Sequence, residues 1–141
     1  MAEYQILLVE DNPDDEMLML DALDRCGVHA PVFVARDGSE ALDYLLPKGD
    51  RKDHMMALRL VLLDLKLPKL GGLEVLRRMR ADERTKHVPV VVLTSSSEHE
   101  DILTSYANGA NAYVRKPIDF EHFLGAIRCL QTFWIMFNET V

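Results

Sequence analysis

The chain has 141 residues, of which 48% are apolar and 28% charged, and its net charge is −7. This length and composition fit one globular domain, 1–141, with a single core. The acidic balance argues against direct nucleic-acid binding, because phosphate backbones attract basic surfaces. The apolar run near the start is too short for a signal peptide or a membrane span, so we expect a cytoplasmic protein with no membrane partner.

Short runs rich in Val, Ile and Leu recur along the chain, as is typical of strands covered on both faces. Stretches with apolar residues at three- and four-residue spacing lie between them and predict helices. The predicted strands are Ile6–Val9, Val32–Ala35, Leu60–Leu63, Val88–Leu93 and Ala112–Val114. The predicted helices cover about 13–26, 38–46, 72–82, 98–108 and 119–135.

Capping residues mark the starts of these helices. Asn12 before Pro13 is typical of an N-cap followed by a first-turn proline. Asp37 and Ser97 each stand three residues before a glutamate, which is the capping-box spacing. We interpret the acids Asp14 and Asp15 as first-turn partners of the helix dipole, with a structural role. Gly27, Gly109 and Asp119 are further predicted helix boundaries.

Strict alternation of five strands and five helices predicts an α/β fold with a doubly wound parallel sheet. Right-handed crossovers leave few topologies, and we expect the flavodoxin-like strand order 2-1-3-4-5. The charged stretch 47–57 is interpreted as a surface insertion within one domain.

The C-terminal segment, 119–141, has apolar residues almost all around its predicted helix, which one buried face does not require. Exposed apolar surface of this kind usually marks an interface. We therefore expect a homodimer through this extended helix and tail. The alternative is that the tail folds back over its own core.

Ligands of such a sheet bind at the carboxyl ends of the strands, so the residues directly after each apolar run are the candidates. The predicted strand order brings two acids, a third acid, a hydroxyl and an amine to one edge. These residues are Glu10 and Asp11 after the first strand, Asp64 after the third, Thr94 after the fourth, and Arg115 and Lys116 after the fifth.

Three neighbouring carboxylates repel one another unless a hard cation with oxygen ligands, such as Mg²⁺, compensates. Such a cation with a nucleophilic carboxylate, a hydroxyl and an ammonium is suited to phosphoryl transfer. Asp64 is the candidate nucleophile, Thr94 and Lys116 face the phosphoryl oxygens, and Glu10 and Asp11 hold the metal. A lone Asp after a strand is most often a turn residue, so the assignment of Asp64 depends on its neighbours.

Four ordered motifs resemble the response-regulator receiver family (CheY-like): EDN at 10–12, VLLDLKLP around Asp64, VVVLTS with Thr94, and YVRKP at 113–117. The resemblance covers about residues 4–132. It implies a stand-alone response regulator of a two-component phosphorelay that accepts a phosphoryl group from a histidine kinase onto Asp64. It also implies self-phosphorylation and autodephosphorylation rather than a turnover enzyme.

The same resemblance implies that Glu10, Asp11, Asp64 and the main-chain carbonyl of Lys66 bind Mg²⁺. It implies a cis bond before Pro117. Thr94 and the aromatic Tyr113 would form the switch, since movement of Thr94 toward the phosphate opens room for the ring. The DNPDD opening and the insertion look like regulators paired with bacterial phytochrome kinases.

Some residues depart from the family's usual pattern. Lys66 is a second cation where smaller or polar residues are frequent, so it is expected to alter autodephosphorylation. Gly71 stands where an acid often precedes the glycine, and a small effect on the loop is expected.

Two other protein classes fit the residue pattern less well. A haloacid-dehalogenase-type phosphatase typically needs a second Asp two residues after its nucleophile, where Lys66 stands. A flavodoxin-like cofactor binder needs a phosphate loop after the first strand, where Glu10 and Asp11 would repel phosphate.

Overall fold

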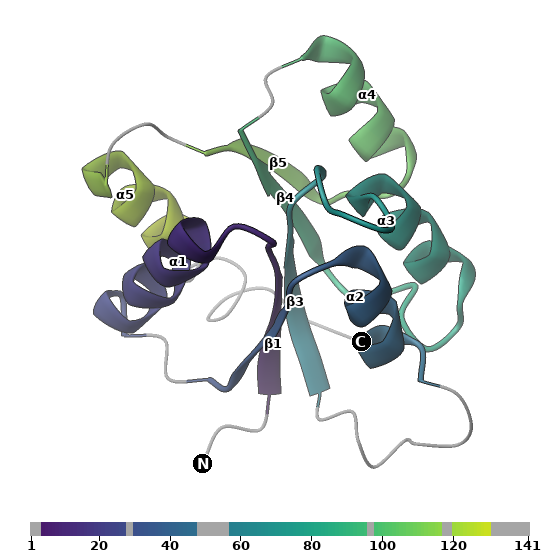
Figure 1. The fold of residues 1–141 in the computed structure, drawn as a ribbon, viewed down its shortest axis with the longest axis horizontal. Coiled ribbons are helices and arrows are strands. Elements are labelled where there is room, and N and C mark those ends of the chain that lie inside the picture. Colours follow the sequence, from purple (N-terminus) through teal and green to yellow (C-terminus); the bar gives the residue numbers. More distant parts are fainter. Residues whose placement is uncertain (1–3, 28–29, 48–56, 96–97, 117–119, 131–141) are drawn as a thin grey trace.

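The computed structural model describes residues 4–27, 30–47, 57–95, 98–116 and 120–130. Within these residues five strands and five helices alternate along the chain, as predicted (Figure 1). The strands are β1 (Tyr4–Val9), β2 (Val32–Ala35), β3 (Ala57–Leu63), β4 (Val90–Thr94) and β5 (Ala112–Arg115). The helices are α1 (Pro13–Arg25), α2 (Gly38–Leu45), α3 (Gly72–Ala81), α4 (His99–Ala107) and α5 (Phe120–Leu130).

All five strands belong to one parallel sheet in the order β2-β1-β3-β4-β5, which confirms the predicted topology. The register places Val9 beside Leu63 and Thr94 beside Arg115. The carboxyl ends of β1 and β3 therefore finish level with each other, as do those of β4 and β5. This alignment sets the residues that follow each strand along one edge of the sheet.

Helices cover both faces of the sheet (Figure 1): α1 and α5 lie on one face and α2, α3 and α4 on the other. Successive strand residues point to opposite faces, so each strand contributes to two separate cores. In β1, Ile6 and Leu8 pack with Met19 of α1, while Leu7 and Val9 belong to the cluster beneath α2 and α3. Burial on both faces explains why the central strands have unalternating apolar sequences.

Two strand boundaries differ from the prediction. β3 begins at Ala57 rather than Leu60, because a bulge at Arg59 lets pairing with β1 continue past an irregularity in register. β4 begins at Val90 rather than Val88. The Val88 N–H donates to the carbonyl of Thr85 at 3.1 Å in a turn, and Pro89 has no N–H to offer a ladder.

The helix caps follow the prediction in two cases and depart from it in one. Asn12 Oδ1 accepts the N–H groups of Asp14 and Asp15 at 2.9 and 3.2 Å, and Asp37 Oδ1 accepts from the Glu40 N–H at 2.7 Å. α4 departs from the prediction because its N-cap residue is Glu98, while Ser97, from which a capping box is predicted, lies outside the described residues.

Some predictions concern residues outside the described ranges. These are most of the insertion (48–56), the cis bond to Pro117, the helix beyond Leu130 and the tail through which dimerisation is expected. None of the helices in the described part of the chain has the length and apolar character that a bilayer span needs.

Candidate phosphoryl-acceptor site

Glu10 and Asp11 follow β1 at the carboxyl edge of the sheet. Glu10 is buried, and its Oε2 accepts the main-chain N–H of Asn12 at 3.2 Å. Burial raises the pKa of Glu10 to about 7, although the hydrogen bond and charge of Lys116 oppose this rise. Asp11 is exposed. One acid is thus set in the protein interior and its neighbour faces solvent.

Asp64 follows β3 directly. Because β3 is the middle strand of the sheet, the main chain of Asp64 is held in place. Its N–H donates to the carbonyl of Val9 at 3.1 Å, which ties the residue to the end of β1. The carboxylate is largely buried: Oδ1 accepts the Lys66 N–H at 3.4 Å and Oδ2 accepts from Lys116 Nζ at 3.2 Å. The side chain is therefore held by two partners while it remains at the edge of the sheet.

The carboxylates of Glu10, Asp11 and Asp64 form a group that could hold a metal ion. Each offers one oxygen, and these oxygens lie within 4.8 Å of one another. An all-oxygen set that carries negative charge suits hard divalent cations such as Mg²⁺ rather than softer metals. The raised pKa of Glu10 agrees with this: burial and the charge of Asp64 raise it in spite of Lys116, so a bound cation would stabilise the charged form of this carboxylate.

Lys116 follows β5 and reaches back across the sheet edge to three carboxylates. Its Nζ donates to Glu10 Oε1, to Asp15 Oδ2 at 2.9 Å and to Asp64 Oδ2 at 3.2 Å. Burial by itself lowers the pKa of Lys116, but the hydrogen bonds to Glu10 and Asp15 and the charge of Asp64 outweigh burial and raise it. The ammonium therefore stays charged at neutral pH.

Asp15 is a member of this site that the sequence interpretation missed. The sequence predicts only a partner of the helix dipole here, yet the Asp15 carboxylate pairs with Lys116. Asp15 stands in the first turn of α1, close after the acids that follow β1, and this position was the available signal. The direction of the side chain separates the two roles.

Thr94 and Tyr113 lie on the neighbouring strands. Thr94 ends β4 fully buried, and its carbonyl accepts the N–H of Lys116 at 2.7 Å. Tyr113 is half-buried against the α2/α3 core cluster, and its N–H donates to Tyr106 Oη at 3.1 Å. The predicted hydroxyl, amine and aromatic residues therefore lie on adjacent strands, and β5 is linked to the α4 side chain of Tyr106.

The loop from β3 to α3 passes very close to Asp64. A Cβ added to Gly72 would lie 2.2 Å from the Asp64 carbonyl oxygen, whereas one added to Gly71 would meet only the Leu65 carbonyl at 3.8 Å. Gly72 has ordinary negative φ, so the requirement here is for space. The glycine lets the start of α3 approach the main chain of the candidate nucleophile.

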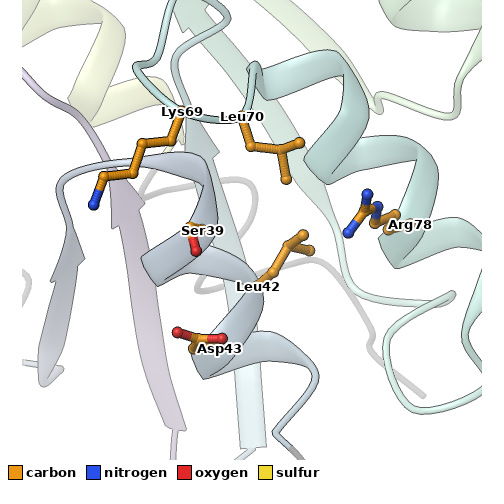
Figure 2. Close-up of a pocket in the computed structure, with 6 residues that line it drawn as sticks. All are labelled: Ser39, Leu42, Asp43, Lys69, Leu70 and Arg78. Carbon is orange, nitrogen blue, oxygen red and sulfur yellow. The ribbon is translucent and has the colours of Figure 1, made fainter.

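A separate hollow lies between α2 and α3, away from the acidic edge of the sheet that Glu10, Asp11 and Asp64 form. Its volume is about 350 Å³, and Figure 2 shows Leu42 and Leu70 directed into it from the two sides. Lys69 extends away from Leu70 and pairs with Asp37 at 3.4 Å. None of the acidic-edge residues lines this hollow. The residues that line it are Ser39, Leu42, Asp43, Lys69, Leu70 and Arg78.

The doubly wound sheet, the acidic group at its carboxyl edge and the lysine from β5 define a flavodoxin-like protein of the receiver class. Comparison with known proteins agrees, since the family model for the response regulator receiver domain matches residues 6–128. The chain therefore belongs to the response regulator receiver domain family, which takes part in two-component signalling.

Two similar proteins span nearly the whole chain. The probable methanogenesis regulatory protein FilR2 of Methanothrix harundinacea is 40% identical over 138 residues, which are 97% of this chain and 87% of FilR2. Response regulator Rcp1 of Synechocystis is 34% identical over 136 residues, which are 96% of this chain and 90% of Rcp1.

Solved structures of response regulators, two of them named for phytochromes, share the fold. The phosphorylated cyanobacterial phytochrome response regulator RcpA has a TM-score of 0.89 and 36% identity, with 99% of each chain covered. The Mn²⁺-bound form of Rcp1 has a TM-score of 0.86 and 31% identity over 97% of this chain and 98% of Rcp1. The bacteriophytochrome response regulator AtBRR has a TM-score of 0.76 and 48% identity over 99% of this chain and all of AtBRR (100%).

Proposed function

We propose that this protein is a stand-alone response regulator that accepts a phosphoryl group from a histidine kinase onto Asp64. The main support is the position of the Asp64 carboxylate, which lies beside the Lys116 ammonium. One of its oxygens is also within 4.8 Å of a carboxylate oxygen of Glu10 and of Asp11. Phosphorylated RcpA, which shares the fold and 36% of its sequence, supports the proposal.

In the proposed reaction an Asp64 oxygen attacks phosphorus, and the phosphorus–nitrogen bond of the kinase phosphohistidine breaks. The imidazole leaves with the bonding electron pair and takes up a proton, so the chain gains one acyl phosphate. Lys116 neutralises charge that develops on the phosphoryl oxygens, and Thr94 donates a hydrogen bond to one of them. Later attack by water would return Asp64 to its free carboxylate.

Glu10, Asp11 and Asp64, with the main-chain carbonyl of Lys66, are the residues that would hold Mg²⁺. Bound there, the ion would supply the positive charge that three neighbouring carboxylates and a phosphoryl group need. The oxygen-only donor set and the Mn²⁺-bound form of Rcp1 support this part of the proposal.

The response to phosphorylation involves Thr94 and Tyr113. If Thr94 moves toward the phosphoryl group, the half-buried Tyr113 ring gains space and turns inward. The Tyr113 N–H and the Tyr106 hydroxyl are linked, so a change at β5 reaches α4. A local change of charge would thereby alter a packed surface on the α4 face.

The partner in this proposal is a phytochrome-type histidine kinase in the cytoplasm. Its support is the set of phytochrome-associated relatives, RcpA and AtBRR among them. The output would be a changed surface or a homodimer through the C-terminal helix and tail, because the relatives FilR2 and Rcp1 extend little beyond the matched region.

The proposal is tested with a small phosphodonor, such as phosphoramidate, in the presence of Mg²⁺. The wild type should gain one phosphoryl group by intact mass, and chelation of Mg²⁺ should suppress the gain. Asp64→Asn should gain none, whereas Asp14→Asn, which removes an exposed acid nearby, should be phosphorylated normally. Phosphorylation that persists in Asp64→Asn would refute the assignment of the acceptor.

A further inference from the structure

The ammonium group of Lys116 has three hydrogens, and three carboxylates accept from it. The acceptors belong to Glu10, Asp15 and Asp64. A lysine in this state has no hydrogen left for a new acceptor. Contact with an incoming phosphoryl oxygen therefore requires Lys116 to give up one of these carboxylates.

The three carboxylates differ in how readily they can be released. The side chains of Glu10 and Asp64 are 1% and 10% exposed, whereas that of Asp15 is 37% exposed. A buried carboxylate that loses its counter-charge is strongly destabilised, while water can solvate an exposed one. While the phosphoryl group approaches and Asp64 is still a carboxylate, the contact between Asp15 and Lys116 is thus the one that costs least to break.

The helix cap fixes Asp15 in its place beside Lys116. Its N–H donates to Asn12 Oδ1 at 3.2 Å, in the first turn of α1. The ion pair with Lys116 joins this turn to the residue that follows β5. Asp15 therefore connects the start of α1 to the same ammonium that neighbours Asp64.

We propose that Asp15 is a positioning residue that holds Lys116 in the unphosphorylated state and competes with the phosphoryl group for its ammonium. This inference rests on the proposed phosphorylation of Asp64. When Asp64 carries a phosphoryl group, Lys116 exchanges the Asp15 carboxylate for a phosphoryl oxygen. The first turn of α1 then loses its tie to the end of β5.

The test measures phosphorylation by phosphoramidate and Mg²⁺ in Asp15→Asn, which keeps the shape of the side chain and removes its charge. The rate constant should rise about 2- to 5-fold, in keeping with the strength of a partly exposed ion pair. Asp15→Ala should show the same rise if its circular dichroism matches that of the wild type. Asp15→Glu, which keeps the charge, should stay close to the wild-type rate.

Asp14→Asn is the matched control, because Asp14 is an acid in the same helical turn and is exposed. A general effect of negative charge near the site would raise the rate equally in both Asn variants. The decisive readout is the Lys116→Ala background, where Asp15→Asn should no longer change the rate. Equal rates for Asp14→Asn and Asp15→Asn, a slower Asp15→Asn, or an effect that persists without Lys116 would each overturn the inference.

Failure of this inference can be told apart from failure of the proposed function. A wild type that takes no phosphoryl group, or an Asp64→Asn variant that still takes one, contradicts the function of Asp64. A wild type that is phosphorylated on Asp64, with an Asp15→Asn rate equal to that of Asp14→Asn, contradicts only the role of Asp15.

Discussion

Replacing Gly72 by alanine would push a methyl group into the main chain of the candidate phosphorylation site. The added carbon would lie 2.2 Å from the Asp64 carbonyl oxygen and 2.8 Å from Leu65 Cα. Both distances fall far inside the roughly 3.5–4.0 Å at which non-bonded heavy atoms attract. Both contacting atoms belong to the backbone, so no side chain can rotate to relieve the overlap.

The structure allows the size of this effect to be worked out. Overpacking usually costs about 1–3 kcal/mol, and the fixed backbone partners of Gly72 favour the upper end. Alanine also restricts the unfolded chain more than glycine does, which by itself raises the free energy of unfolding by about 0.4–1 kcal/mol. The net loss in free energy of unfolding should be about 2–2.5 kcal/mol. For a chain of this size that corresponds to a Tm lower by about 8–10 °C.

Urea denaturation followed by circular dichroism measures this difference, and Gly71→Ala is the neighbouring control. Its added carbon would lie 3.8 Å from the Leu65 carbonyl, an ordinary contact, so its stability should stay within about 0.5 kcal/mol of the wild type. Gly72→Ala should also take up less phosphoryl group, because Asp64 shifts with its carbonyl. Equal stability of the two variants would refute the steric reasoning.

Two further predictions concern stability. Arg80→Met should lose about 2–4 kcal/mol in urea denaturation, because its guanidinium donates to main-chain carbonyls in the loop before β4 and in the loop before β5. Arg77→Met, on the exposed side of the same helix, should lose less than about 1 kcal/mol, and a similar loss in both would contradict this account. Asp37→Ala should lower Tm by removing the cap bond to Glu40, worth about 1 kcal/mol. A Tm of Asp37→Ala equal to that of the wild type would contradict the role of this cap.

The fold could be predicted from the sequence because the central strands are buried on both faces. Runs such as Leu60–Leu63 are too apolar for an exposed strand and too short for a helix, so the number and order of the strands could be predicted. The first and last residues of each strand were harder to predict, since they depend on individual hydrogen bonds. Val88 has a strand-like side chain, but its N–H is used in a turn.

The candidate site was predictable to the extent that strand order determines it. Glu10, Asp64 and Thr94 come together because parallel strands end at one edge. Asp15 was missed because it lies in the first turn of a helix, where an acid is also favourable as a partner of the helix dipole. Only the direction of its side chain toward Lys116 separates the two roles, and a sequence pattern does not contain that direction.

The placement of the acids on β1 and β3 has a consequence for partial opening of the molecule. These strands lie inside the sheet, between β2 on one side and β4 on the other. Backbone amides in such strands exchange with solvent mainly when the whole domain unfolds, whereas helices and edge strands open more readily. We therefore expect the residues that follow β1 and β3 to be attached to the part of the chain that opens last. Local opening of a helix would then leave the spacing of Glu10 and Asp64 unchanged.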